Sequence, residues 1–179
     1  MVAVDPIRRI LIVGFMASGK TSVGQELANL LEWKFHDFDS IIEDRTGVTI
    51  SEIFCRDGEE HFRKLESDLA LELFQEEQVV LSSGGGWPSR PGNWECVPDG
   101  TLSIWLRVSP EVAVKRASSG GPTRPMLEGE DPLGSAIKLL EQREDLYGRA
   151  QITLNSDNCY TSNLATKIMN IVIDQKDQE

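Results

Sequence analysis

An eight-residue segment near the N-terminus, residues 14–21, constrains the fold more than any other feature of the chain. It reads Gly-Phe-Met-Ala-Ser-Gly-Lys-Thr and fits the pattern G-x-x-x-x-G-K-[ST]. An apolar run at 10–13 precedes it and a helical pattern at 22–31 follows it, which is the context that this motif requires. In such a loop the backbone N–H groups point inward at phosphate oxygens, and the helix N-terminus adds a positive dipole end. The segment therefore predicts a phosphate-binding loop.

Apolar runs bounded by turn residues recur along the rest of the chain and are separated by helical patterns. The runs are 79–81, 102–108 and 152–154, residues 33–38 form a further probable strand, and apolar residues at helical spacing mark 60–75 and 164–173. This alternation predicts an α/β fold with a parallel sheet covered by helices on both faces. A chain of 179 residues suits one domain, so we expect a single domain over 1–179.

Capping patterns predict where several helices begin. A cap residue stands three positions before a glutamate twice, and a good N-cap precedes a proline twice. The residues are Thr49 with Glu52, Asp57 with Glu60, and Ser109 and Asp131 before the prolines. We expect helices to begin near residues 50, 58, 110 and 132. The stretch at 117–130 is rich in Gly, Pro and Ser, so it predicts either a mobile lid carrying Arg124 or an ordinary surface loop.

Two aspartates, Asp37 and Asp39, stand at the end of the candidate strand 33–38. Alternation along a strand would put both on one side, at the carboxyl edge of the sheet where open α/β folds bind ligands. One carboxylate could then reach a Mg²⁺ ion held by the Thr21 hydroxyl, and the other could meet an acceptor hydroxyl. An Asp-x-Asp pair alone is commonly a solvated turn, but its place beside a phosphate loop favours a functional role.

Three glycines and three arginines are the remaining candidates. Gly84, Gly85 and Gly86 end the strand at 79–81, and such a run indicates either a tight turn or a place where a substrate approaches bare backbone. If the fold brings Arg63 and Arg143 near Asp39, their planar guanidinium groups could pair with a substrate carboxylate, whereas Arg124 could stabilise the transferred phosphoryl group.

Charge and cysteine content exclude several classes of protein. The chain carries 18 Lys and Arg against 29 Asp and Glu, a net charge of −11, which argues against nucleic-acid or anionic-membrane binding. No run approaches the ~20 apolar residues of a membrane helix. The three cysteines are odd in number and form no Cys-x-x-Cys pair, so we expect no disulfide framework, no thiolate zinc site and a cytoplasmic location. The two histidines are interpreted as non-ligands.

Taken together, these motifs resemble the shikimate kinase family, and the resemblance covers about residues 9–167. The matching pieces are the phosphate loop 14–21, Asp37-Phe38-Asp39, Ile53-Phe54 with Gly58-Glu59, Phe62-Arg63-Lys64-Leu65-Glu66, Gly84-Gly85-Gly86, Arg124-Pro125-Met126-Leu127 and Arg143-Glu144-Asp145-Leu146-Tyr147. The resemblance implies a P-loop NTPase fold of the nucleoside-monophosphate-kinase type, with a five-stranded parallel sheet and a lid. It also implies transfer of the ATP γ-phosphate to the 3-hydroxyl of shikimate, a step of aromatic amino-acid biosynthesis, by a monomer.

The same resemblance implies a role for each site residue. Lys20, Asp39 and Arg124 would be catalytic, Thr21 and Asp37 would hold Mg²⁺, and Arg116 would stack on adenine. The ATP-binding set is Gly14, Ala17, Ser18, Gly19, Lys20, Thr21, Ser22, Arg116 and Arg124. The shikimate-binding set is Asp39, Arg63, Gly84, Gly85, Gly86 and Arg143, with Gly85 acting through its backbone.

Three departures from the family pattern accompany the resemblance. Ala17 stands where many members have glycine, so we expect a negative φ there. Trp87 stands where a small residue is usual, and it would either wall the substrate or fill the core. The segment 156–160 lacks the arginine and proline often found on the adenine side. Two alternatives remain open: a related kinase of another small hydroxy acid such as gluconate, or of a nucleotide, and a kinase-like ATP-binding module without catalysis.

Overall fold

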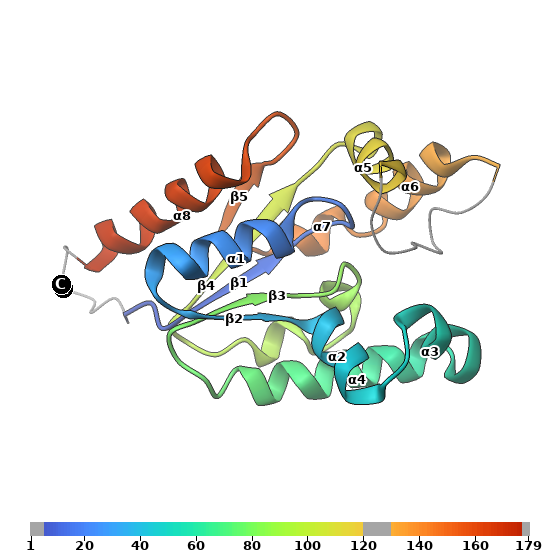
Figure 1. Cartoon of the computed structure of the whole chain (residues 1–179), viewed down its shortest axis with the longest axis horizontal. Helices are drawn as coiled ribbons and strands as arrows, with labels where there is room; N and C mark the ends of the chain where they lie inside the picture. The colour runs from blue at the N-terminus through green and yellow to red at the C-terminus, as the bar shows by residue number, and fades with distance from the viewer. Residues whose placement is uncertain (1–5, 120–129, 177–179) are drawn as a thin grey trace.

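The computed structural model describes residues 6–119 and 130–176, and it contains one five-stranded parallel sheet (Figure 1). The sheet order is β2-β3-β1-β4-β5, so the strand that leads into the phosphate loop lies in the centre. The strands are β1 (Arg9–Val13), β2 (Lys34–Asp37), β3 (Val79–Ser82), β4 (Thr101–Arg107) and β5 (Ile152–Asn155). The predicted parallel α/β sheet is therefore confirmed.

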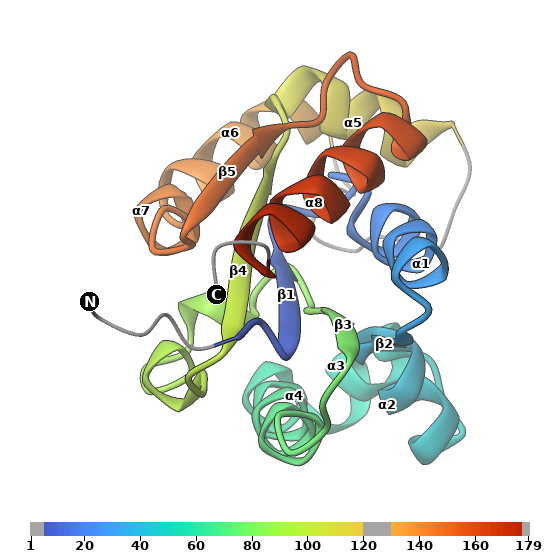
Figure 2. The same ribbon diagram turned by 90° about the vertical axis from the view of Figure 1, so that its left-hand side faces the viewer.

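Helices cover both faces of the sheet, as predicted (Figure 2). One face is covered by α1 (Lys20–Leu31) and α8 (Thr161–Lys176), which pack against each other. The elements that contribute to the core of the opposite face are α2 (Phe38–Thr46), α3 (Ile50–Asp57), α4 (Glu59–Leu73), α5 (Pro110–Ser118), α6 (Pro132–Glu141), α7 (Glu144–Tyr147) and the short 3₁₀ helices η1 (Trp87–Ser89) and η2 (Trp94–Cys96). Among the described residues, no helix has the length and apolar character needed to cross a bilayer.

The central strand β1 joins the two hydrophobic cores. Leu11 and Val13 contribute to the core beneath α4, whereas Ile10 and Ile12 contribute to the core beneath α1 and α8. Successive side chains of a strand point to opposite faces, so a strand covered on both faces must be apolar throughout. This explains why the run before the phosphate loop is continuous rather than alternating, and it fixes the start of that loop rigidly.

Most of the predicted helix starts are confirmed by their hydrogen bonds. Thr49 and Glu52 form a complete capping box at the start of α3. The Ser109 hydroxyl accepts a hydrogen bond from the Val112 N–H, and Asp131 accepts one from the Gly134 N–H at 2.8 Å.

The helix start expected near residue 58 is confirmed, since α4 begins at Glu59, but the capping box expected there from Asp57 and Glu60 is wrong. Asp57 is the last residue of α3, and its carboxylate pairs with Arg56. The cap of α4 is Gly58, whose φ of +85° favours glycine. A single residue therefore separates the two helices, so Asp57 cannot begin the second one.

Two expectations about the strand ends need correction. β2 ends at Asp37 and α2 begins at Phe38, so Asp39 lies in the first turn of a helix rather than on the strand. Strand alternation does not extend to Asp39, because Asp37 itself caps that helix, accepting a hydrogen bond from the Ser40 N–H. Both aspartates nevertheless lie at the carboxyl edge. Trp87 fills the core: it is fully buried and packs edge-on against Phe38, Phe74 and Trp94.

Candidate active site

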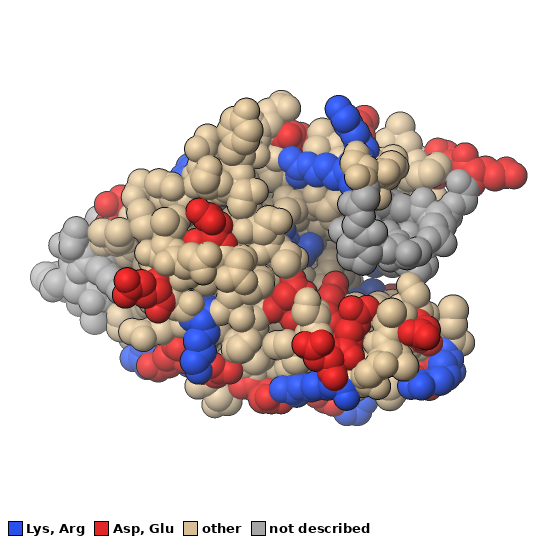
Figure 3. Space-filling model, viewed as in Figure 1, with Lys and Arg blue, Asp and Glu red and all other residues tan. Residues whose placement is uncertain are grey.

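A cavity of about 1040 Å³ opens at the carboxyl edge of the sheet, between the phosphate loop and helices α2 to α4. Figure 3 shows this face hollowed, with basic side chains visible in the hollow and acidic ones along its lower rim. The predicted site residues that line the cavity are Ala17, Ser18, Gly19, Lys20, Thr21, Ser22, Asp37, Asp39, Arg63, Gly84, Gly85, Gly86, Arg116 and Arg143. Topology therefore brings together residues spread over more than a hundred positions of the chain.

The phosphate loop curls through residues of positive φ. These are Gly14 at +148°, Ala17 at +59° and Gly19 at +95°. Gly14 lies behind the cavity lining, where a Cβ would stand 2.5 Å from the Leu106 carbonyl oxygen. The buried Lys20 side chain folds back over the loop, and its Nζ donates to the carbonyl oxygens of Gly14 and Phe15 at 3.0 and 2.9 Å. The ammonium group thus lies at the floor of the loop, where phosphates would bind.

The expectation that Ala17 has a negative φ is wrong. The loop requires a left-handed residue at this position, and alanine adopts that conformation at a cost of about 1 kcal/mol. Arg116, in the last turn of α5, supports the strained peptide by donating to the Ala17 carbonyl oxygen at 3.2 Å. The same guanidinium donates to the carbonyl oxygens of Ser156 and Asp157 at 2.6 and 3.2 Å, so it links the loop to the segment after β5.

Thr21 and Asp37 meet at the phosphate side of the cavity. The Thr21 hydroxyl donates to Oδ2 of Asp37 at 2.7 Å. These are hard oxygen ligands of the kind that Mg²⁺ takes from proteins, usually one or two at a time with nucleotide phosphates supplying others. Within residues 6–119 and 130–176 no cluster of three or more His, Cys, Asp and Glu could hold a metal alone. The donor set therefore fits a Mg²⁺ ion that arrives with a nucleotide.

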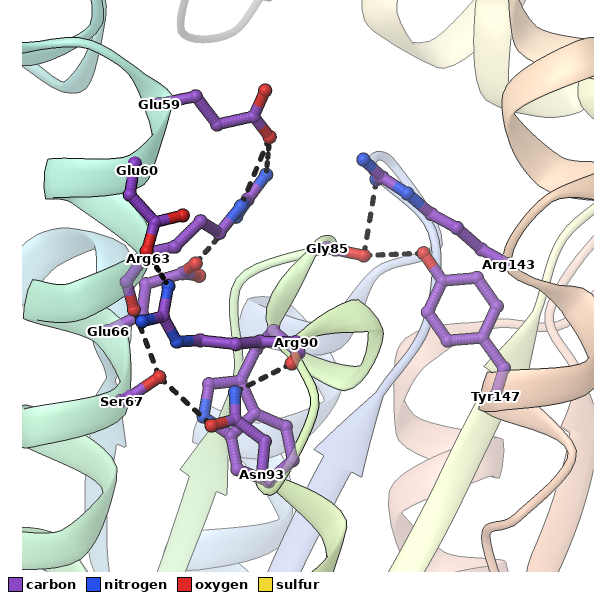
Figure 4. Close-up of polar contacts among 11 residues, drawn as sticks. Glu59, Glu60, Arg63, Glu66, Ser67, Gly85, Arg90, Asn93, Arg143 and Tyr147 are labelled. Carbon is purple, nitrogen blue, oxygen red and sulfur yellow. Dashed lines mark hydrogen bonds and ion pairs between the residues drawn. The ribbon is translucent and has the colours of Figure 1, made fainter.

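The opposite side of the cavity holds a buried cluster of charges. Arg63 pairs with Glu66 at 2.5 Å and with Glu59 at 2.9 Å, as Figure 4 shows. Glu66 is fully buried, and burial raises its pKa to about 7 although the Arg63 guanidinium opposes that shift. Burial, reinforced by the Asp37 charge, likewise raises the pKa of Asp39 to about 6. Asp39 therefore has a pKa near neutrality, which suits a group that accepts a proton.

Each of the three consecutive glycines faces a different neighbour. A Cβ on Gly84 would overlap Oε1 of Glu66, and one on Gly86 would overlap the Arg63 guanidinium. Gly85 packs against the phosphate loop, where a Cβ would lie 3.4 Å from the Met16 nitrogen. None of these glycines has a positive φ. Close approach of the protein's own side chains, rather than the freedom of a turn, therefore favours glycine at Gly84 and Gly86, whereas the contacts at Gly85 are ordinary van der Waals ones.

Arg143 faces this cluster from across the cavity. It lies immediately before α7 and is only 7% exposed, and its Nη1 donates to the Gly85 carbonyl oxygen at 3.4 Å. Figure 4 shows the Arg63 and Arg143 side chains on opposite sides of Gly85. Arg63, Arg143 and Asp39 all line one cavity, which is the arrangement in which the two arginines could pair with a substrate carboxylate. Arg124 and most of the expected lid lie outside the described residues.

Comparison with known proteins assigns the chain to a family. The family described as shikimate kinase matches residues 16–173. The chain belongs to the shikimate kinase family. A shikimate kinase of Synechococcus sp. (strain RCC307) is 39% identical over 160 residues, covering 89% of this chain and 82% of that protein. A shikimate kinase structure from Acinetobacter baumannii, in complex with shikimate, has a TM-score of 0.88 at 34% identity and covers 95% of both chains.

Other small-molecule kinases share the fold at a greater distance. A gluconokinase structure from Sinorhizobium meliloti 1021 has a TM-score of 0.63 at 18% identity, covering 96% of this chain and 95% of that one. Similarity at that level shows a common architecture only. The gluconate alternative is therefore not favoured over the shikimate kinase family.

Glu66 is the residue at the centre of this site that sequence reasoning did not assign to it. The segment that carries Arg63 includes Glu66 three positions later, and residues at that spacing on a helix lie on one face. That spacing was the available signal. Its burial was not readable from the sequence, because it depends on the glycines packing against it.

Proposed function

We propose that this shikimate kinase family member transfers the γ-phosphoryl group of ATP to the 3-hydroxyl of shikimate, giving shikimate 3-phosphate and ADP. One observation carries the proposal. A single cavity joins a phosphate loop to a half-buried Asp39 that has Arg63 and Arg143 on either side of its glycine floor. Shikimate is a small polyol carboxylate, so two arginines would pair with its carboxylate and an aspartate would accept a hydrogen bond from one of its hydroxyls.

The phosphate loop would bind the triphosphate of ATP. Its inward N–H groups, the N-terminus of α1 and the Lys20 ammonium would neutralise the β- and γ-phosphates. Arg116 would lie beside the adenine, since it lines the cavity next to the segment after β5. These contacts would fix the γ-phosphorus in line with an acceptor oxygen, and positioning of this kind supplies much of the catalysis in phosphoryl transfer.

Thr21 and Asp37 would hold the Mg²⁺ ion that accompanies ATP, Thr21 through its hydroxyl and Asp37 directly or through water. When bound, the ion supplies positive charge that stabilises the phosphate oxygens as the γ-phosphoryl group leaves ADP. The protein's own contribution is to place these two oxygens beside the loop at the start of α1 and the end of β2.

On the acceptor side, Arg63 and Arg143 would bind the shikimate carboxylate and so aim the 3-hydroxyl at ATP. Asp39 would accept the hydroxyl proton as the oxygen bonds to the γ-phosphorus and the bond to the ADP oxygen breaks. A carboxylate with a pKa of about 6 is largely ionised at neutral pH and able to take that proton. Arg124 and a lid over 117–130 would close over the phosphates and exclude water.

We also propose that the single domain works as a monomer in the cytoplasm. The three cysteines are exposed and free, as expected in a reducing compartment.

The test is Mg²⁺-dependent release of ADP from ATP in the presence of shikimate, gluconate, AMP or no acceptor. Release with shikimate alone would support the proposal. A preference for another acceptor would retain the phosphate-loop assignment and overturn the acceptor assignment. ATP binding without turnover on any acceptor would favour a non-catalytic module.

A further inference from the structure

A tyrosine beneath the glycine segment makes a contact that the proposed reaction does not use. Tyr147 is the last residue of α7 and is fully buried, and its hydroxyl donates to the Gly85 carbonyl oxygen at 2.5 Å (Figure 4). Its ring stacks on Trp105 of β4, with centroids 5.8 Å apart. Burial raises the pKa of Tyr147 to about 12, so the hydroxyl keeps its proton and remains a donor. The hydroxyl is therefore held in place by a rigid ring.

The Gly85 carbonyl oxygen is held by two hydrogen-bond donors, both from the α7 side of the cavity. Tyr147 and Arg143 are four residues apart, and both donate to this single oxygen. The described residues contain no cis peptide bond, so the Gly86 N–H points opposite to the Gly85 C=O. That direction leads away from α7, toward the side on which the Arg63 guanidinium packs against the Gly86 Cα.

The Gly86 N–H is free to meet a ligand. Across the residues that the structure describes, it donates to no protein acceptor, and Gly86 lines the cavity. An anion bound between Arg63 and Arg143 would lie next to this N–H. The orientation of the peptide plane between Gly85 and Gly86 therefore sets two things. It sets the direction of the Gly86 N–H, and it places the Gly85 carbonyl oxygen to which the Arg143 guanidinium is bound.

We propose that Tyr147 is a positioning residue for the substrate carboxylate, holding the Gly85 carbonyl so that the Gly86 N–H and the Arg143 guanidinium both face the bound anion. The inference rests on the proposed function, since it takes shikimate as that anion. Tyr147 acts through these two groups and does not itself touch the substrate.

The variant Tyr147→Phe removes the hydroxyl and keeps the ring and its stacking on Trp105. We expect the KM for shikimate to rise about fivefold to tenfold, the loss that follows from one weakened hydrogen-bonding arrangement. Because the carboxylate lies away from the reacting hydroxyl, kcat and the KM for ATP should change less than about twofold. A purely structural role would instead lower the melting temperature and the active fraction, reducing kcat without moving the KM for shikimate.

Ser103→Ala is the matched control. Ser103 lies on β4, the strand of Trp105, and its buried hydroxyl is hydrogen-bonded to Gln151. It does not line the cavity. Its KM for shikimate should equal that of the wild type. A wild-type KM in Tyr147→Phe, or an equal rise in Ser103→Ala, would overturn the inference and leave the proposed function intact.

A second measurement uses the wild-type chain and so does not depend on a variant folding. In a ¹H–¹⁵N titration with shikimate, the Gly86 amide should show one of the largest shifts of any backbone resonance. An unmoved Gly86 resonance at saturating shikimate would overturn the inference. Failure of the wild type to bind or turn over shikimate would overturn the proposed function, and the inference with it.

Discussion

The two sides of the cavity are built in different ways. Most of the phosphate side is one continuous segment, residues 14–21, whose working groups are backbone N–H groups, one lysine and one threonine hydroxyl; Asp37 and Arg116 are its contacts from elsewhere in the chain. The acceptor side is assembled from α2, α4, the glycines after β3 and the start of α7, and its working groups are buried charged side chains. Backbone N–H donors are kept when a side chain is substituted, whereas a buried charged side chain is stable only while its ion-pair and hydrogen-bond partners are present.

This difference predicts unequal tolerance to substitution. On the acceptor side, removing one partner leaves another charge buried without compensation, which is costly. On the phosphate side, the loop already accommodates Ala17 in a strained conformation without losing its shape. Substitutions on the acceptor side should therefore affect one another strongly, whereas on the phosphate side a change at a position that acts only through its backbone, such as Ala17, should have a small and local effect.

The largest expected effect is that of Asp39→Asn. The variant keeps the shape of the side chain but cannot accept the hydroxyl proton, so kcat should fall by about 10²- to 10⁴-fold. The KM for ATP should stay within about twofold of the wild type, because the phosphate side is separate. Steady-state kinetics with each substrate varied would show this; a near wild-type kcat would remove Asp39 from its catalytic role.

Arg63→Ala should come next, because it leaves Glu66 buried without its partner. The side chain of Arg63 is only 12% exposed and that of Glu66 is 0% exposed. We expect the free energy of unfolding to fall by about 3 kcal/mol and the KM for shikimate to rise. Urea unfolding would measure the loss, and the double variant Arg63→Ala with Glu66→Gln should recover part of it. No recovery would show that the two charges are not coupled.

The pH dependence of stability isolates Glu66. Its folded pKa of about 7 lies above that of an ordinary glutamate, so its contribution to stability is complete below about pH 4.5 and is lost as the pH rises through 7. From pH 5 to pH 8 the wild type should lose roughly 1–3 kcal/mol relative to Glu66→Gln, which does not titrate.

Urea unfolding at pH 5, 6, 7 and 8 would measure this change. Glu72→Gln is the control, since Arg45 lowers the pKa of that exposed carboxylate and keeps it ionised over the whole range. The difference between the wild type and Glu72→Gln should therefore be flat with pH. A flat difference for Glu66→Gln as well would contradict the prediction.

The smallest effect is expected from Ala17→Gly on the phosphate side. Glycine adopts the left-handed conformation without strain, so the variant should be more stable by about 0.5–1 kcal/mol, with an unchanged KM for ATP. Ala28→Gly, in the buried face of α1, should have the opposite sign because glycine weakens a regular helix. Thermal unfolding would compare the two; a destabilised Ala17→Gly would mean that the loop is held by contacts of the alanine methyl group.

More of the phosphate side than of the acceptor side could be predicted from the sequence, for a physical reason. The phosphate loop is local, so its strand, loop and helix could be predicted from a continuous run of residues. The left-handed conformation of Ala17 could not be predicted, because the loop as a whole imposes it on a residue type that rarely adopts it. The continuous apolar strands and their parallel order followed from burial on both faces.

On the acceptor side, the residue types were readable but their environment was not. Arg63 and Arg143 were candidates only on the condition that the fold brings them together, and Glu66 was not placed in the site, because its burial depends on the fit of Gly84 against it. Asp39 was placed at the correct edge by strand alternation, but the strand ends at Asp37 and a helix that the sequence pattern did not predict begins at Phe38. Trp87 could have lain in the site or in the core, and only packing against three other rings decides for the core.

The central position of β1 has a consequence for synthesis of the chain. Arg9 pairs with Val79 on one side and with Thr101 on the other, so the first strand made has both of its partners still to come. At ribosomal rates the second partner follows roughly 5 to 18 s later. During that interval five residues destined for complete enclosure offer two open strand edges to any other polypeptide. The strand that leads into the phosphate loop therefore gains from shielding by the ribosome or a chaperone until its partners are made.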